Sequence, residues 1–192
     1  MTVPADQPLF AFAGHRLIAR GPASDVVPVV HVVTAAGEGV LVFDADAGRV
    51  IDLDLRGDAA DVLARLAPAP EPEKRGPGRP KLGVTAREVT LLPRHWDWLA
   101  SQPGGASVAL RKLVEGALKE AEGPDRARKA RDATYRFMTA IAGDLPGYEE
   151  ATRMLFAGDW TAFGAVVEAW PEEVRDVARE MAAGAWQKGA GA

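Results

Sequence analysis

Residues 39–58 read GVLVFDADAGRVIDLDLRGD, and this stretch has the pattern of a β-hairpin. The apolar run LVF at residues 41–43 is typical of a buried strand, and Asp-Ala-Gly at residues 46–48 supplies turn residues. Apolar and polar side chains then alternate over residues 50–55, which predicts a second strand with one wet face. The stretch therefore predicts antiparallel sheet and, with the helical segments around it, an α+β fold.

The residues on either side extend this unit. Upstream, residues 8–20 (PLFAFAGHRLIAR) predict two short strands. Residues 24–36 are rich in β-branched side chains, but a Ser-Asp pair beginning at Ser24 is a typical helix N-cap, so helix is favoured over strand. Downstream, residues 58–66 (DAADVLARL) predict a short amphipathic helix. Residues 1–67 are therefore predicted to form a small α+β domain.

A linker is predicted over residues 68–85, because residues 68–83 contain five prolines and three glycines. Proline removes backbone donors and glycine adds conformational freedom, so regular structure is disfavoured there. The linker separates the first domain from a segment over residues 86–122 and from a helical domain over residues 123–192.

The formal net charge of −4 conceals a strongly basic middle. Residues 74–131 carry 13 basic and 6 acidic side chains, a net +7. The flanks are acidic, with a net −6 over residues 1–73 and a net −5 over residues 132–192. This asymmetry predicts a polyanionic partner for the middle of the chain, whereas the simpler interpretation is a solvated helical face.

Within the basic middle, Gly78-Arg79-Pro80, with Arg75 and Lys81 beside it, resembles the core of an AT-hook. A flat backbone held extended by proline lies along a narrow minor groove, where arginine meets the enhanced negative potential of AT-rich sequence. The resemblance implies that Arg75, Arg79 and Lys81 contact AT-rich double-stranded DNA. Pro77 departs from the pattern, since a second core arginine often stands at that position. The alternative is a solubilising linker with incidental charge.

Residues 86–122 resemble a ribbon–helix–helix DNA-binding domain. A strand candidate at residues 87–92 precedes a helix that starts with Pro93, a glycine-containing turn and a second helix over residues 107–122. The resemblance implies a homodimer whose paired strands form a ribbon in the major groove. It also implies inward-facing apolar side chains on both helices and a phosphate held by the backbone that starts the second helix. The inward residues are Trp96, Leu99, Leu110, Leu113, Val114 and Ala117, and the phosphate-binding residues are Gly105 and Ser107.

The predicted strand leaves two registers open, because a strand buries only one face. In one register Val89 and Leu91 point inward and Thr90 faces the groove, and in the other Arg87, Val89 and Leu91 face it. We expect Thr90, with Arg87 or Arg94, at the edge of the ribbon. Neither register presents two or three of the side chains that usually read base edges, so low sequence discrimination is expected.

An ordinary helix-turn-helix is the nearest structural alternative for the same segment. In that geometry Arg111 and Lys112, near the start of the second helix, approach the bases. Both geometries place the basic segment on DNA and differ in whether residues 87–92 form an intermolecular strand.

The final part of the chain predicts helices near residues 125–142, 146–157, 159–169 and 171–187. Basic side chains at the start of the first helix either extend the phosphate-contacting surface or form a solvated turn. Aromatic side chains at helical spacing predict a small core, and a surplus apolar face would dock a protein partner. The basic residues are Arg126, Arg128, Lys129 and Arg131, and the aromatic ones are Phe156, Trp160, Phe163, Trp170 and Trp186.

No catalytic, metal or cofactor site is predicted, so an enzyme is not expected. An EF-hand loop beginning at Asp44 would need a glutamate where Leu55 stands, and the nearby aspartates fit the wet face of a strand. The chain has no cysteine, three scattered histidines and no phosphate-binding loop with its preceding strand. A signal peptide and a membrane-spanning segment are not evident, which favours a cytoplasmic protein.

Nearly the whole chain resembles an uncharacterised bacterial family known only as a domain of unknown function. The resemblance is carried by GRVIDLDLRG at residues 48–57, by residues 78–107 and by AGDLPGYEEATRMLFAGD at residues 142–159. It implies a bacterial origin and no particular activity. From the residues we expect a DNA-binding protein of the regulatory or nucleoid-associated kind, with an antitoxin-like protein-interaction module as the alternative. A third and weaker hypothesis is that the chain is a small-molecule sensor.

Overall fold

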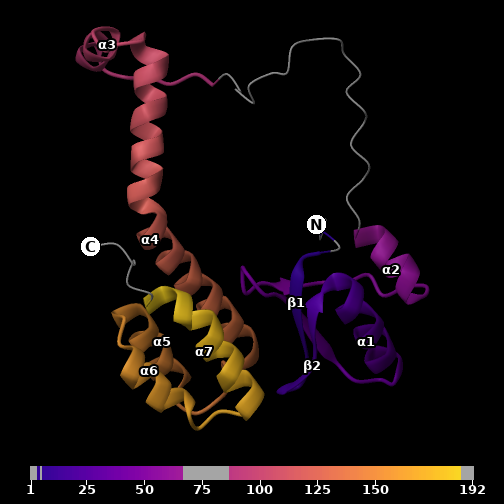
Figure 1. Ribbon diagram of the computed structural model, residues 1–192. Helices are drawn as coiled ribbons and strands as arrows, with labels where there is room; N and C mark the ends of the chain where they lie inside the picture. The colour runs from indigo at the N-terminus through magenta and orange to yellow at the C-terminus, as the bar shows by residue number, and fades with distance from the viewer. Residues whose placement is uncertain (1–3, 5, 67–86, 187–192) are drawn as a thin grey trace. The chain divides into compact units, whose positions relative to one another are not determined.

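The computed structural model describes residues 4, 6–66 and 87–186 of the chain (Figure 1). The chain divides into two compact units. The larger unit comprises residues 1–69 and 123–192, and the smaller unit comprises residues 70–122.

The larger unit is built on a four-stranded antiparallel sheet in the order β2-β1-β3-β4. The strands are β1 (Pro8–Ala13), β2 (Arg16–Pro22), β3 (Val40–Asp44) and β4 (Val50–Ile51). The two strands predicted over residues 8–20 are confirmed, and Gly14, with φ of +57°, makes the turn between them. At the β2 edge, the backbone N–H of Leu17 donates to Glu173 Oε2 at 2.6 Å.

The alternation of side chains along the strands gives the sheet two buried faces. One face carries Phe10, Phe12 and Phe43, and the other carries Leu9 and Val42, all of them 5% exposed or less. A sheet with two apolar faces needs a layer of helices on each side. The α+β class predicted from the hairpin is therefore realised as a three-layer arrangement.

Helices α1 (Ala23–Ala35) and α2 (Ala59–Leu66) cover the face that carries Leu9. The choice of helix over strand for residues 24–36 is confirmed, because Ala23, Val26, Val27 and Val30 recur at helical spacing and are all buried. Pro28 lies inside α1 without ending it.

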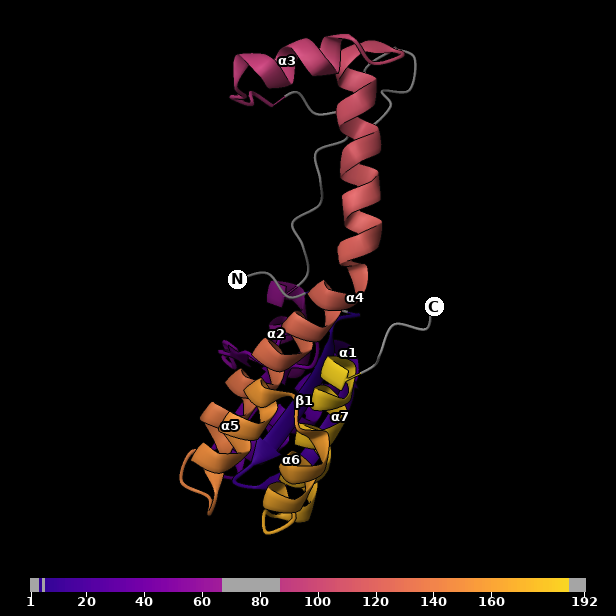
Figure 2. The same ribbon diagram turned by 90° about the vertical axis from the view of Figure 1, so that its left-hand side faces the viewer.

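Helices from the second half of the chain cover the phenylalanine face. They are the end of α4 (Gly105–Ile141), with α5 (Tyr148–Ala157), α6 (Trp160–Val167) and α7 (Glu172–Trp186). The rings of Phe12 and Phe43 pack on Phe137 of α4, with ring centroids 5.7 and 5.0 Å apart. In Figure 1 strands β1 and β2 stand between α1 and α7, and the turned view of Figure 2 shows α5, α6 and α7 lying over β1.

Residues 1–67 and 123–192, predicted as separate domains, thus share one compact unit. The β3–β4 turn is seated directly on α4, where Arg136 Nη1 donates to Ala47 O at 2.9 Å. Gly48 has φ of +64°, and a Cβ on it would lie 1.9 Å from Ala133 O. The two segments share one unit because the sheet face that carries Phe10, Phe12 and Phe43 would be uncovered in residues 1–67 alone.

The second strand of the predicted hairpin is shorter than expected. Residues 50–55 alternate as a strand should, but only Val50 and Ile51 pair with β3. Beyond them Arg65 of α2 donates to the carbonyl of Asp54 at 2.7 Å, so this carbonyl is bonded by a side chain and not by a strand.

Helix α4 also differs from expectation, because it is continuous where two helices, 107–122 and 125–142, were predicted. Pro124 lies inside it and cannot donate a backbone hydrogen bond to Glu120. Glu120, whose carbonyl loses this donor, is an exposed residue. The boundary between the two units falls at residues 122 and 123, within this helix.

Candidate nucleic-acid interface

The predicted DNA-contacting residues divide into two groups. Those of the arm, Arg75, Arg79 and Lys81, lie outside the described residues. The other group lies in the smaller unit, where its members are exposed except for the half-buried Gly105. This group comprises Arg87, Thr90, Arg94, Gly105, Ser107, Arg111 and Lys112.

Residues 87–92 are not a strand in the single chain. Leu92 is extended, with φ of −67° and ψ of 150°, and helix α3 (Pro93–Ala100) follows with Pro93 in its first turn, as predicted. Arg87 and Thr90 therefore lie on an exposed segment, and Arg94 lies in the first turn of α3. A segment of this kind acquires strand hydrogen bonds only from a partner strand, and within the described residues this chain offers it none.

Two glycines with positive φ lie where α4 begins: Gly104, just before the helix, at +86°, and Gly105, its first residue, at +73°. The N–H of Gly105 donates to Gln102 O at 2.9 Å. Ser107 is exposed in the first turn of α4, and its carbonyl accepts from Arg111 Nε at 3.0 Å. Ser107 and Arg111 thus share one face of α4.

The basic charge is distributed unevenly between the two units. Residues 74–86 carry four basic and no acidic side chains, residues 87–122 carry five of each, and residues 123–131 carry four basic and one acidic. Among the residues with described positions, no ion pair joins Arg87, Arg94, Arg111 or Lys112 to a carboxylate. The net +7 therefore comes from the arm and from residues 123–131.

The smaller unit leaves most of its large apolar side chains exposed. Leu99 is 3% exposed, as its predicted inward position requires, but Trp96, Leu113 and Val114 are 40%, 51% and 54% exposed. An apolar groove of about 340 Å³ lies between residues 91–99 and α4. Its lining residues are Leu91, His95, Trp98, Leu99, Leu110 and Leu113. His95 and Trp98 were not predicted to line a groove, although their spacing along α3 with Leu99 is that of one helical face.

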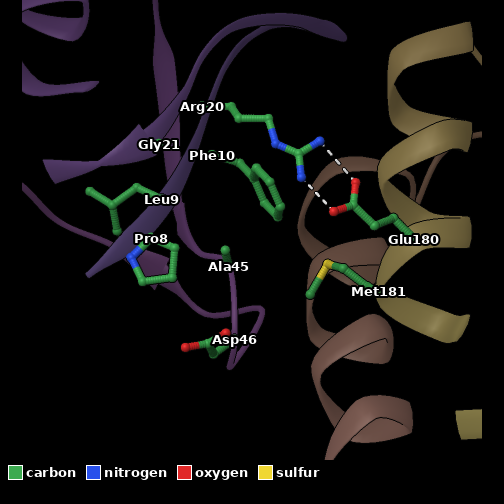
Figure 3. A pocket seen from close by; sticks show the side chains of 9 residues that line it. All are labelled: Pro8, Leu9, Phe10, Arg20, Gly21, Ala45, Asp46, Glu180 and Met181. Atoms are coloured by element: carbon green, nitrogen blue, oxygen red, sulfur yellow. Dashed lines mark hydrogen bonds and ion pairs between the residues drawn. The ribbon is translucent and has the colours of Figure 1, made fainter. Parts of the chain in front are cut away.

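A second cavity, of about 310 Å³, lies in the larger unit between the sheet and α7 (Figure 3). Arg20 reaches from β2 to Glu180, donating from Nη1 to Oε2 at 2.9 Å and from Nη2 to Oε1. Its guanidinium lies 5.2 Å from the centroid of Phe10, and the hydrogen bond to Glu180 raises the pKa of Arg20. Nothing in the sequence marks this pair, because 160 residues separate its members.

The pair between Arg20 and Glu180 is half-exposed, at 51% and 50%, so we expect Arg20→Ala to lower the free energy of unfolding by only about 1 kcal/mol. Arg16→Ala is the matched control. Arg16 lies on the same strand as Arg20, and it forms an ion pair with Glu38 that is similarly exposed. Urea denaturation of the two variants measures the difference. A loss several times larger for Arg20→Ala would show that the pair holds the sheet against α7.

The aspartates of the hairpin have structural roles. Asp44 Oδ1 accepts the backbone N–H groups of Asp46 and Ala47, both at 2.9 Å, and so closes the β3–β4 turn. The guanidinium of Arg56 bonds Asp54 and holds the pKa of that carboxyl well below its usual range. Three or more metal-ligating side chains do not gather at any point among the described residues.

Within the same residues, no helix combines the length and the apolar character needed to cross a bilayer.

Comparison with known proteins adds a family. The model of a family described as uncharacterised proteins conserved in bacteria (DUF2239) matches residues 8–182. No curated protein and no solved structure matches the chain.

Proposed function

The chain belongs to this bacterial family, DUF2239, and from its own residues we propose that it is a DNA-binding protein of the regulatory or nucleoid-associated kind. The proposal has two parts: a basic arm that enters the minor groove, and a smaller unit that pairs with a second copy and places two arms on one duplex. Sequence discrimination is low in this proposal, because the exposed segment at residues 87–92 offers few side chains that read bases.

The observation that carries the proposal is the net positive charge of the arm, residues 74–86. Residues 74–86 hold four cations and no carboxylate, around the Gly78-Arg79-Pro80 core. Each cation that neutralises a phosphate releases counterions, which gives binding a strong salt dependence. The AT-hook-like core adds a preference for narrow, AT-rich minor grooves.

The second part rests on the apolar face of the smaller unit. Trp98 and Leu113, which line the apolar groove, are each 51% exposed, and Leu118 is 64% exposed. In the proposed dimer, two copies of this face bury one another's apolar side chains about a twofold axis. Residues 87–122 have no net charge to oppose this pairing, and two copies of residues 87–92 give each other a partner strand.

Leu91 favours one of the two registers left open by the sequence. Its side chain lines the groove, so in a paired ribbon Thr90 would face the DNA. Arg87 and Arg94 flank that surface, and the exposed start of α4 at Ser107 is available to a phosphate.

We expect Arg79→Ala to weaken binding to an AT-rich duplex about tenfold, because the side chain that enters the groove is lost. The slope of log affinity against log salt falls by about 0.9 if one phosphate contact is lost with it. Fluorescence anisotropy with AT-rich and GC-rich duplexes over a salt series measures both. Arg16→Ala, which removes an exposed arginine from β2, is the control and should bind as the unmodified chain does.

Two results of this experiment would contradict the proposal: no duplex binding at low salt, or an affinity that does not change with salt. If Arg79→Ala binds the duplex as tightly as the unmodified chain does, the DNA contact would be assigned not to the arm but to the cations of the smaller unit. These are Arg87, Arg94, Arg111 and Lys112.

The exposed groove also favours a second candidate, a protein-interaction module such as an antitoxin-like partner. In that case a different protein, and not a second copy, covers Trp98 and Leu113. Recovery of a stoichiometric partner with the full chain, together with a monomeric state when it is purified alone, would support this candidate.

A further inference from the structure

Exposed aromatic rings gather at one end of the helices in the larger unit. Tyr135 of α4, Phe156 of α5 and Trp160 of α6 are 39%, 49% and 39% exposed. Tyr135 and Phe156 meet with ring centroids 5.6 Å apart, and Trp160 lies 4.7 Å from Trp186 of α7. We call these four residues the aromatic end.

Two glycines show which helices lie close together near these rings. A Cβ on Gly158, between Phe156 and Trp160, would lie 3.7 Å from the indole Nε1 of Trp186. One on Gly184 would lie 3.0 Å from Ala130 Cβ, so the end of α7 also packs on α4. The helices that carry the two ring pairs are therefore close neighbours at this end.

Cations lie beside these rings on α4. Arg128, Arg131 and Tyr135 follow the i, i+3, i+7 spacing of one helical face. Residues 123–131 carry a net +3. The pair of Arg128 with Asp125 is an exposed i, i+3 pair, which is weak enough to exchange for a phosphate.

Much of the acidic charge of the same helices is paired elsewhere. Glu168 pairs with Arg175 and Arg179, and Glu180 pairs with Arg20. Asp159, the acidic residue nearest Trp160 in the sequence, accepts the N–H of Ala162 as the N-cap of α6. Of these pairs, only that of Glu180 with Arg20 brings in a cation from outside residues 132–192, whose net charge is −5.

Polar groups without partners belong to the helices around this surface. Three buried side-chain atoms of the described residues lack a hydrogen bond, and they are Arg131 Nε, Thr152 Oγ1 and Trp186 Nε1. Thr152 lies one turn before Phe156, and Arg131 lies one turn before Tyr135. Unpaired buried polar groups are costly, and ordered water is a usual partner where the chain supplies none.

We propose that the aromatic end binds single-stranded nucleic acid. Bases stack on the exposed faces of Phe156 and Trp160, and Arg128 and Arg131 hold the phosphates. Ring stacking with nearby cations is the usual basis of single-strand binding, and it tolerates any base because each has a flat face. The proposal uses only residues of the larger unit, so it is independent of the duplex contact assigned to the arm.

The test measures the anisotropy of a labelled oligothymidylate at low salt with the full chain and its Phe156→Ala variant. Because one stacked base is lost, we expect Phe156→Ala to bind about tenfold more weakly. Phe156→Tyr keeps the ring and should bind as the unmodified chain does. Val32→Ala, at another exposed apolar residue of the larger unit, is the control, and thermal melting of all variants checks folding.

A second comparison separates this surface from the arm. Arg79→Ala should weaken duplex binding and leave oligothymidylate binding unchanged. Phe156→Ala should weaken oligothymidylate binding and leave duplex binding unchanged. The proposal is overturned if oligothymidylate does not bind, or if Phe156→Ala leaves its affinity unchanged. Loss of self-association in Phe156→Ala without oligonucleotide binding would assign the surface to a second copy and would equally overturn it.

Discussion

Gly48→Ala is expected to lower the free energy of unfolding of the larger unit by about 3 kcal/mol or more. Two effects add at this position. The backbone of Gly48 is left-handed, with φ of +64°, and an added Cβ would lie 1.9 Å from the backbone oxygen of Ala133. Because that oxygen belongs to α4, it cannot move aside as a flexible side chain does. The whole β3–β4 turn would have to lift from the helix.

The chain offers a control that separates the two effects. Gly14 also has a positive φ, +57°, but a Cβ there would meet nothing within 4 Å. Gly14→Ala therefore carries only the backbone strain, about 1–2 kcal/mol. Urea denaturation followed by circular dichroism measures both variants. Equal losses in the two would mean that the turn is not seated on α4 and that the close approach has no energetic weight.

Leu113→Glu is expected to abolish self-association of the chain at micromolar concentration. The substitution places a carboxylate on the wall of the apolar groove, where a second copy would have to bury it. In the proposed dimer two arms act on one duplex, so the monomeric variant should also bind DNA about a hundredfold more weakly. Sedimentation equilibrium and duplex anisotropy measure the two effects.

The single-chain fold does not depend on this side chain, because Leu113 is 51% exposed. Val32→Glu makes the same change at a residue of α1 that is 68% exposed and lies in the other unit, so it should alter neither quantity. If Leu113→Glu remained a dimer, the groove would not be the interface. If the unmodified chain were monomeric, DNA binding would rest on the arm alone.

Local pattern predicted the secondary structure well where residues carried a clear period. Pro93 marked the start of α3. The helix over residues 24–36 was predicted from an N-cap at Ser24, whereas α1 begins at Ala23 with Pro22 as its N-cap. Local patterns predicted the secondary structure wrongly where it depends on contacts with residues far away in the sequence. Residues 50–55 alternate as a strand, but Arg65 takes the carbonyl of Asp54. Pro124 looked like a helix boundary, but its surroundings are exposed and the helix continues.

Local sequence patterns also could not predict that residues 1–69 and 123–192 pack into one unit. Phe12 and Phe137 are far apart in the sequence, and only the structure shows their rings in contact. Of the candidate interface, the sequence alone indicates the charge of the arm, since charge needs no partner to be counted. The groove beside Trp98 needed coordinates, because burial within a single chain cannot be read from composition.

The phenylalanine side of the sheet has a consequence for synthesis on the ribosome. Phe10, Phe12 and Phe43 emerge early, whereas the helices that shield them come from residues 123–192 and emerge last. At about 5–20 residues per second, the nascent chain displays these rings for several seconds before their cover is translated. Translation that stops before residue 123 should yield an aggregation-prone fragment that binds chaperones or precipitates.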